Sequence, residues 1–168
     1  MKKTLIFLFF CFLLGSFAVC NSASLKLGSQ IPGLKLPTLS GASYDLASDR
    51  GKTVIITFYS TWSRSCLDQL EFLNSLSSSN KKLEVVAVAL DKNTSAVKAF
   101  LEKNGFKFTA LIDKRMKSLT SFQILIIPTA FLIDSTGVLR NIYVDFDDAT
   151  KGSIAADVKD LLSPKKTD

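Results

Sequence analysis

The sequence predicts an α/β protein, a three-layer α/β/α sandwich with a mixed central sheet. The first observation is the run "TVIITFY" at 53–59, which is β-branched and aromatic without polar alternation, as in a strand covered on both faces. The second is that such runs alternate with segments of helical spacing, an order that places helices on both faces of a parallel sheet. The third is a hairpin pattern near the end of the chain, which adds antiparallel strands to that sheet.

The first half of the chain contributes two buried strands and the helix between them. Residues 24–52 are rich in Gly, Ser and Pro, with short extended pieces such as "LKLPTL" and a turn at "SGAS". After the strand at 53–59, residues 65–78 are predicted to be helical, because four leucines and Phe72 recur at helical spacing. Residues 83–90, "LEVVAVAL", are the second buried strand.

The second half completes the sheet and covers it. A helix over 94–104 ends at the "NG" of 104–105, because glycine readily takes the left-handed conformation that closes a helix. A short strand "FTALID" and a short helix over 114–123 follow. The chain then closes with a hairpin and a last helix, at 129–134, 138–146 and 150–162.

The first residues have the layout of a bacterial-type secretory signal. Two lysines precede an apolar segment at 5–14, which is short for a membrane span, and small and polar residues follow. We expect a signal peptide at 1–23, cleaved after Ala23 or after Cys20, and one domain at 24–168. Lipid attachment at Cys20 is the alternative, because "FAVC" loosely resembles a lipoprotein box. The protein is therefore expected in the periplasm or on the extracytoplasmic face of the membrane, with membrane contact only if Cys20 carries lipid.

Cysteine and histidine usage limits the chemistry. Of three cysteines, Cys11 lies in the apolar segment and Cys20 in the cleavage zone, so Cys66 is the only one certain to remain after export. One thiol gives no internal disulfide framework. The chain has no histidine, which excludes a Ser–His or Cys–His pair and histidine-bound zinc or haem.

Charge and acidic residues indicate neither nucleic acid nor metal. Without its first 23 residues the chain has 19 basic and 15 acidic residues, and the basic ones are scattered. The acidic run "DFDD" at 145–148 lacks the glycine and ligand spacing of a calcium loop and is interpreted as a solvated loop that caps the last helix. We expect no cofactor and no metal.

Four stretches together resemble the thioredoxin superfamily, in its TlpA-like or redoxin-type exported branch. They span most of residues 30–146 and read "IPGLKLPTLSGASYDL", "ITFYSTWSRSC", "VVAVALDKN" and "IIPTAFLIDSTGVLRNIYVDF". The resemblance implies a thioredoxin-like fold and thiol–disulfide oxidoreductase chemistry at the junction of strand and helix. It also implies a cis bond between Ile127 and Pro128, beside the active-site loop.

The resemblance places Ser63 at the position of the nucleophilic cysteine and Cys66 at that of the resolving one. A hydroxyl cannot take part in sulfur exchange, although serine is a good helix N-cap. The resemblance further places Thr57 and Gln69 where family members carry a proton-accepting acid, and Glu71 where thioredoxins carry a kinking proline. Dithiol activity is therefore expected to be weakened or lost.

Two interpretations of Cys66 stay open, a small buried apolar residue and a reactive monothiol assisted by the helix N-terminus and Arg64. Trp62 is interpreted as a partial lid or as plain hydrophobic cover. With Arg64, Ile127 and Pro128 it would form a groove in which the backbone of Ile127 pairs with an extended client chain. The clients implied are thiol-containing envelope proteins, either apocytochromes or other thiol clients.

Three functions follow in order of support. The first is a thiol–disulfide oxidoreductase type of protein with residual monothiol activity, and the second is a non-catalytic client-binding module. The third is a peroxiredoxin-like peroxidase, since Ser63 and Cys66 match its Thr/Ser-x-x-Cys spacing. That pattern also needs a proline where this chain has Tyr59, and an arginine for which Arg140, expected to be solvated, is the nearest substitute.

Overall fold

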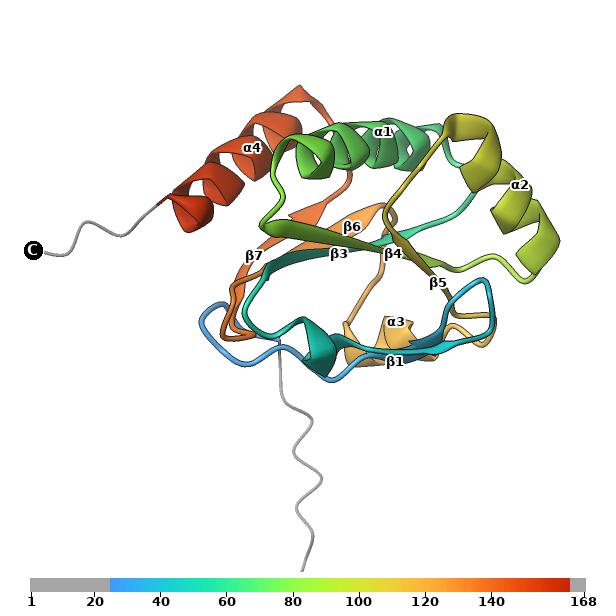
Figure 1. The fold of residues 1–168 in the computed structure, drawn as a ribbon, viewed down its shortest axis with the longest axis horizontal. Helices are drawn as coiled ribbons and strands as arrows, with labels where there is room; N and C mark the ends of the chain where they lie inside the picture. Colours follow the sequence, from blue (N-terminus) through green and yellow to red (C-terminus); the bar gives the residue numbers. More distant parts are fainter. Residues whose placement is uncertain (1–24, 164–168) are drawn as a thin grey trace, which may run out of the picture.

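The computed structural model describes residues 25–163, and the predicted sandwich is confirmed there (Figure 1). Its central sheet has the strand order β5-β4-β3-β6-β7. The first three strands run parallel, and β6 and β7 are antiparallel to their neighbours, which makes the sheet mixed. The strands are β3 (Thr53–Tyr59), β4 (Leu83–Ala89), β5 (Thr109–Ile112), β6 (Thr129–Ile133) and β7 (Leu139–Val144).

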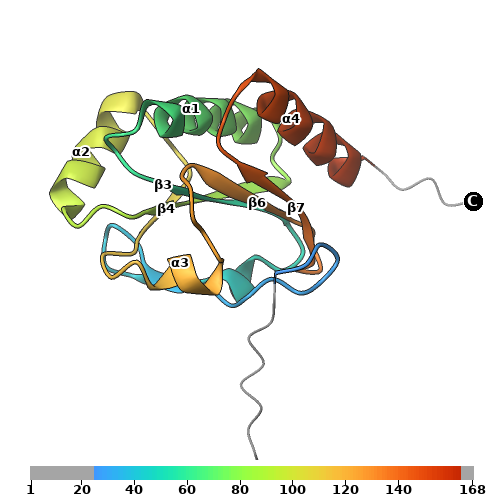
Figure 2. The same cartoon turned by 180° about the vertical axis from the view of Figure 1, so that it is seen from behind.

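Helices and a small hairpin cover the two faces of this sheet. Figures 1 and 2 show three helices on one face, α1 (Arg64–Ser79), α2 (Thr94–Asn104) and α4 (Asp148–Leu162). On the other face lie the short helix α3 (Lys117–Ser121) and a two-stranded hairpin of β1 (Lys35–Pro37) and β2 (Ser43–Asp45).

The core is divided by the sheet, and every residue of β3 is buried. On the α3 side, Phe58, Phe122 and Phe131 pack ring against ring, with centroids 5.1–5.8 Å apart. On the opposite side, Cys66 belongs to a buried cluster between the sheet, α1 and α2 that also contains Tyr59. Burial of these large side chains contributes about 1.5–3 kcal/mol each to folding, so β3 is a rigid base for the loop that follows it.

The structure differs from the sequence-based expectation in three segments. The stretch before β3 holds the expected short extended pieces and turn, paired as a hairpin, and adds a 3-10 turn, Leu46–Asp49, that the sequence did not predict. Helix α3 is shorter than predicted. Asp113 accepts hydrogen bonds from the backbone N–H and the hydroxyl of Ser118, so residues 114–116 form a turn and the helix begins only at Lys117. Helix α4 begins at 148 instead of 150, because Asp147 caps it.

The predicted signal peptide, with Cys20, lies outside the described residues. Among residues 25–163, no helix is both long and apolar enough to cross a membrane.

Candidate functional site

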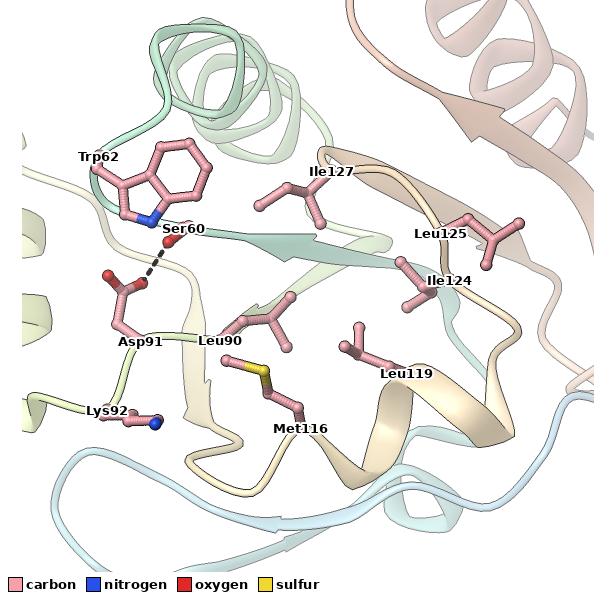
Figure 3. Close-up of a pocket in the computed structure, with 10 residues that line it drawn as sticks. All are labelled: Ser60, Trp62, Leu90, Asp91, Lys92, Met116, Leu119, Ile124, Leu125 and Ile127. Atoms are coloured by element: carbon pink, nitrogen blue, oxygen red, sulfur yellow. Dashed lines mark hydrogen bonds between the residues drawn. The ribbon is translucent and has the colours of Figure 1, made fainter.

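The candidate site begins where β3 ends. Leu90, after β4, donates its backbone N–H to the carbonyl of Tyr59 (3.0 Å), which holds the two strand ends together. Asp91 then accepts hydrogen bonds from Ser60 Oγ (3.2 Å) and from both the N–H and the hydroxyl of Thr61 (3.0 and 2.7 Å). The carboxylate of Asp91 therefore fixes the course of the loop that leads into α1 (Figure 3).

Ser63 is the N-cap of α1. Its backbone is extended, and its Oγ accepts the N–H of Cys66 at 3.4 Å, satisfying one of the amides that have no partner inside the helix. The hydroxyl thus occupies the position that the resemblance assigns to a nucleophilic thiol.

Cys66 is completely buried, and it is the one free cysteine among residues 25–163. Burial raises the pKa of the Cys66 thiol, because the thiolate would lose its water, and the charges of Asp91 and Asp145 raise it further. Ser63 and Ser60 oppose this shift by hydrogen bonding. The thiol is therefore protonated and shielded at neutral pH, the opposite of the exposed, low-pKa environment of a reactive cysteine.

Thr57 and Gln69, the two positions without an acid, face each other under the site. Both side chains are completely buried, and the Thr57 hydroxyl donates to Gln69 Oε1 at 2.5 Å. The amide nitrogen of Gln69 is buried without a partner among the described residues. Glu71, at the position of the kinking proline, is exposed on α1. No side chain of this pair can accept a proton from Cys66 at neutral pH.

The peptide bond between Ile127 and Pro128 is cis. Ile127 packs on the buried cluster that contains Cys66, which places the bond next to the site. The Pro128 carbonyl accepts the N–H of Asp145 at 2.8 Å, and Ser65 in the first turn of α1 donates to the Asp145 carboxylate at 2.9 Å. Asp145 was missed by the sequence-based reasoning as a site residue, since it lies eighty positions from Ser65 along the chain.

Trp62 departs from one of its two expected roles, and Arg64 departs from the role expected for it. Trp62 is 79% exposed, so it is not cover for the core, and it stands at one wall of a groove. Arg64 is turned along α1 and forms an ion pair with Asp68 at 2.8 Å. Its guanidinium is not among the groups that shift the pKa of Cys66, so the predicted assistance to that thiol is not found.

The groove beside the site has a volume of about 460 Å³ (Figure 3). Trp62 and Ile127 form its upper rim, and the wall below combines apolar side chains such as Leu90 and Leu119 with Asp91 and Lys92. The rim continues into large exposed apolar side chains, Leu125 (97% exposed) and Ile126. The remaining lining residues are Ser60, Leu90, Asp91, Lys92, Met116, Leu119 and Ile124.

Arg140 and the acidic run have structural partners. Arg140 was expected to be solvated, but its Nε donates a hydrogen bond to the Asp134 carboxylate at 2.7 Å. In the run at 145–148, Asp147 caps α4 by accepting the N–H of Thr150 at 2.7 Å. Within residues 25–163, no three side chains of the kinds that bind metals gather in one place.

The buried strand β3 is followed by the capped helix α1, and a loop with a cis-proline precedes the neighbouring strand β6. This arrangement defines a thioredoxin-fold protein. The sheet order and the helices on both faces agree with this class. The chain belongs to the AhpC/TSA family, whose model matches residues 27–142.

Relatives of known type support the same class. The chain is 31% identical over 119 residues to the thiol-disulfide oxidoreductase ResA of Bacillus anthracis, covering 70% of this chain and 69% of the relative. It is 32% identical over 128 residues to the thioredoxin-like protein YneN of Bacillus subtilis, covering 74% and 75%. Among solved structures, a thiol:disulfide interchange protein DsbE from Chlorobium tepidum superposes with a TM-score of 0.79 at 27% identity, over 83% of this chain and all of the other. The chain is thus a thioredoxin-like protein of the thiol–disulfide oxidoreductase type.

Proposed function

We propose that this protein is an exported, client-binding member of the thiol–disulfide oxidoreductase type that has lost dithiol exchange. Its ancestral task would be sulfur exchange with thiol-containing envelope proteins, of the apocytochrome type. Its present task would be to hold such clients in the groove between Trp62 and the loop before Pro128.

One observation carries this proposal: no described thiol is available to attack a disulfide. The nucleophile position holds the Ser63 hydroxyl, which is used as a helix cap. Cys66 is buried, and the pKa of its thiol is raised. Exchange requires an accessible thiolate and a second thiol to release the mixed disulfide, and residues 25–163 supply neither.

The groove supports binding on its own. Neither the N–H nor the C=O of Ile127 forms a hydrogen bond among the described residues, so both are available to an added extended chain. The exposed apolar side chains of Trp62, Leu125 and Ile126 adjoin that backbone. Scattered exposed apolar residues need no explanation, but a contiguous group beside a groove indicates a partner. Arg64 would contribute only at the rim, since Asp68 already neutralises it.

Export belongs to the same proposal. A signal peptide at 1–23 would place the domain, 24–168, in the periplasm or on the extracytoplasmic face of the membrane. The mass of protein recovered from the envelope should lack about the first 23 residues. Recovery of the full-length chain would contradict cleavage, and a diacyl mass on Cys20 would instead establish a lipid anchor.

The rival is a monothiol oxidoreductase, and a thiol titration separates the two. We compare the native chain with its Cys66→Ser variant, so that the difference between them reports Cys66 alone. If the proposal is correct, Ellman's reagent should detect the same number of thiols in both proteins in native buffer. In denaturant it should detect one more thiol in the unmodified chain than in Cys66→Ser. A fast native reaction that the substitution abolishes would make Cys66 an exposed nucleophile and the monothiol function correct.

A further inference from the structure

Exposed cations lie in the loop after β5 and at the first residue of α3. Lys114, Arg115 and Lys117 are exposed, as is Lys92 after β4. We call these four residues the cationic ridge. None of them forms an ion pair or a side-chain hydrogen bond within residues 25–163, where the ion pairs involve other cations.

The carboxylates nearest to the ridge in sequence are already engaged. Asp91 accepts hydrogen bonds from Ser60 and Thr61, and buried Asp113 accepts them from Ser118. Asp91 and Asp113 reduce the positive potential around the ridge, but among residues 25–163 they form no ion pair with its cations. The ridge therefore keeps a positive excess that a ligand can use.

The topology brings the ridge to the candidate site. Strands β4 and β5 are parallel neighbours, so their carboxyl ends lie at one edge of the sheet. The N–H of Asp113 donates to the carbonyl of Ala89 at 2.9 Å, which ties the two ends together. Figure 3 shows Lys92 and Met116 on the side of the groove that faces away from Ile127.

The ridge separates two apolar hollows. The first is the groove described above, with Lys92 and Met116 in its wall. The second, of about 450 Å³, lies between the β1–β2 hairpin and the other side of the same loop. Its apolar lining includes Leu36, Leu39 and Ile112, and three of the ridge cations, Lys114, Arg115 and Lys117, line it as well.

We infer that the partner of this protein presents an extended segment in which acidic residues adjoin apolar ones. This inference rests on the proposed client-binding function. Apolar side chains of the segment would enter the hollows, and its carboxylates would meet the cationic ridge. Concave hollows on both sides of the ridge suit protruding side chains, whereas a flat lipid surface would leave them unfilled.

The test uses two short cysteine-free peptides that differ only in charge, one with leucine and glutamate residues and one with glutamine in place of each glutamate. Trp62 is the single tryptophan of the chain and lines the groove, so its emission reports occupancy. The glutamate peptide should bind the chain, as recovered from cells, roughly tenfold more tightly, because several exposed ion pairs would each strengthen binding about twofold. Rising salt should remove this preference.

Charge reversal locates the effect. The combined variant Lys114→Glu, Arg115→Glu and Lys117→Glu should lose the preference, and each single substitution should reduce it about twofold. The matched control is Lys81→Glu with Lys82→Glu, two exposed cations after α1 that lack ion pairs among the described residues. That control should behave as the unmodified chain does.

The outcomes distinguish this inference from the proposed function. Equal binding of both peptides, with a change in Trp62 emission, would overturn the preference for acidic segments but would support client binding in the groove. No emission change with either peptide would overturn both. Binding to phosphatidylglycerol vesicles that the ridge reversal abolishes, without any preference between peptides, would overturn the inference in favour of a lipid surface.

Discussion

The hydroxyl of Thr57 donates to the side-chain oxygen of Gln69 at 2.5 Å, and both side chains are completely buried. These two residues stand at the places where family members carry acids that accept the proton of the resolving thiol. Here they form a neutral hydrogen-bonded pair, in which the amide nitrogen of Gln69 is left without a partner among the described residues. The absence of an ionisable side chain at these two positions is therefore built into the packing of β3 against α1, in addition to the hydroxyl of Ser63 at the start of the helix.

The cap formed by Ser63 predicts a stability effect. Ser63→Ala should lower the free energy of unfolding by about 0.5–1 kcal/mol, the lower part of the range for lost caps, because the hydrogen bond to Cys66 N–H is long. Urea unfolding measures it. Ser75→Ala, at an exposed position inside α1 whose side chain donates no hydrogen bond, is the control and should not destabilise. Equal effects of the two substitutions would show that Ser63 does not act as a cap.

The buried hydroxyl of Tyr59 predicts the reverse effect. It has no hydrogen-bond partner among the described residues, although the ring stacks on Phe100 with centroids 6.2 Å apart. Tyr59→Phe keeps the ring and removes an unsatisfied polar group, so the free energy of unfolding should stay equal or rise by up to about 1 kcal/mol. Tyr143→Phe is the matched control and should destabilise, because that hydroxyl donates to Asp157 at 2.6 Å.

Asp134 predicts a dependence of stability on pH. Burial alone would raise its pKa, but hydrogen bonds from Thr136, Val138 and Arg140 outweigh burial and lower the pKa to about 2. A carboxyl whose pKa is lower in the folded than in the unfolded state stabilises the fold above the unfolded pKa, near 4. That contribution disappears as the pH falls from about 4 to about 2.

The substitution Asp134→Asn tests this dependence. At pH 7 it should cost roughly 1–2 kcal/mol, a figure reduced because Arg140 is partly exposed to solvent. Near pH 2 the variant and the unmodified chain should have similar free energies of unfolding. Asp160→Asn, at an exposed position of α4, is the control. A difference that is constant from pH 7 to pH 2 would contradict the assignment to ionised Asp134.

The parts of the structure that were predicted from sequence are those set by local pattern. The buried strand at 53–59, the leucine spacing of α1 and the stop at Gly105 each depend on neighbouring residues, and each agrees with the structure. The capping role of Ser63 follows from its place before a helix. The ion pair of Arg64 with Asp68 has the spacing of four residues that favours such pairs, and the sequence contained that signal.

The parts that were missed depend on contacts between distant segments. Asp145, just after β7, meets Ser65 in the first turn of α1 only through the tertiary fold, and no local pattern indicates this. The same holds for the cationic ridge. Its residues come from two separate segments, which meet because the carboxyl ends of the parallel strands β4 and β5 lie side by side. Of the two interpretations of Trp62, a partial lid and plain hydrophobic cover, its exposure contradicts only the second, and that exposure depends on how Asp91 holds the loop.

Introducing a second thiol at position 63 tests the proposed absence of dithiol exchange. The unmodified chain should not reduce insulin disulfides in the presence of dithiothreitol, because its described thiol is buried. Ser63→Cys places a thiol at the helix N-terminus, where the dipole and the free amides favour the thiolate. We expect measurable but partial turnover, since Thr57 and Gln69 still provide no proton acceptor for Cys66.

Adding Gln69→Glu to Ser63→Cys supplies that acceptor. General-base assistance contributes about 10²–10⁴ in rate, so the double variant should exceed Ser63→Cys alone by at least about tenfold, the excess growing as the pH rises and the buried carboxyl ionises. Ser63→Cys with Glu71→Gln is the control, because Glu71 lies exposed on the same helix and should leave the rate unchanged. Robust turnover by the unmodified chain, abolished by Cys66→Ser, would make Cys66 itself the nucleophile and refute the assignment of Ser63 and the Thr57–Gln69 pair as the cause of inactivity.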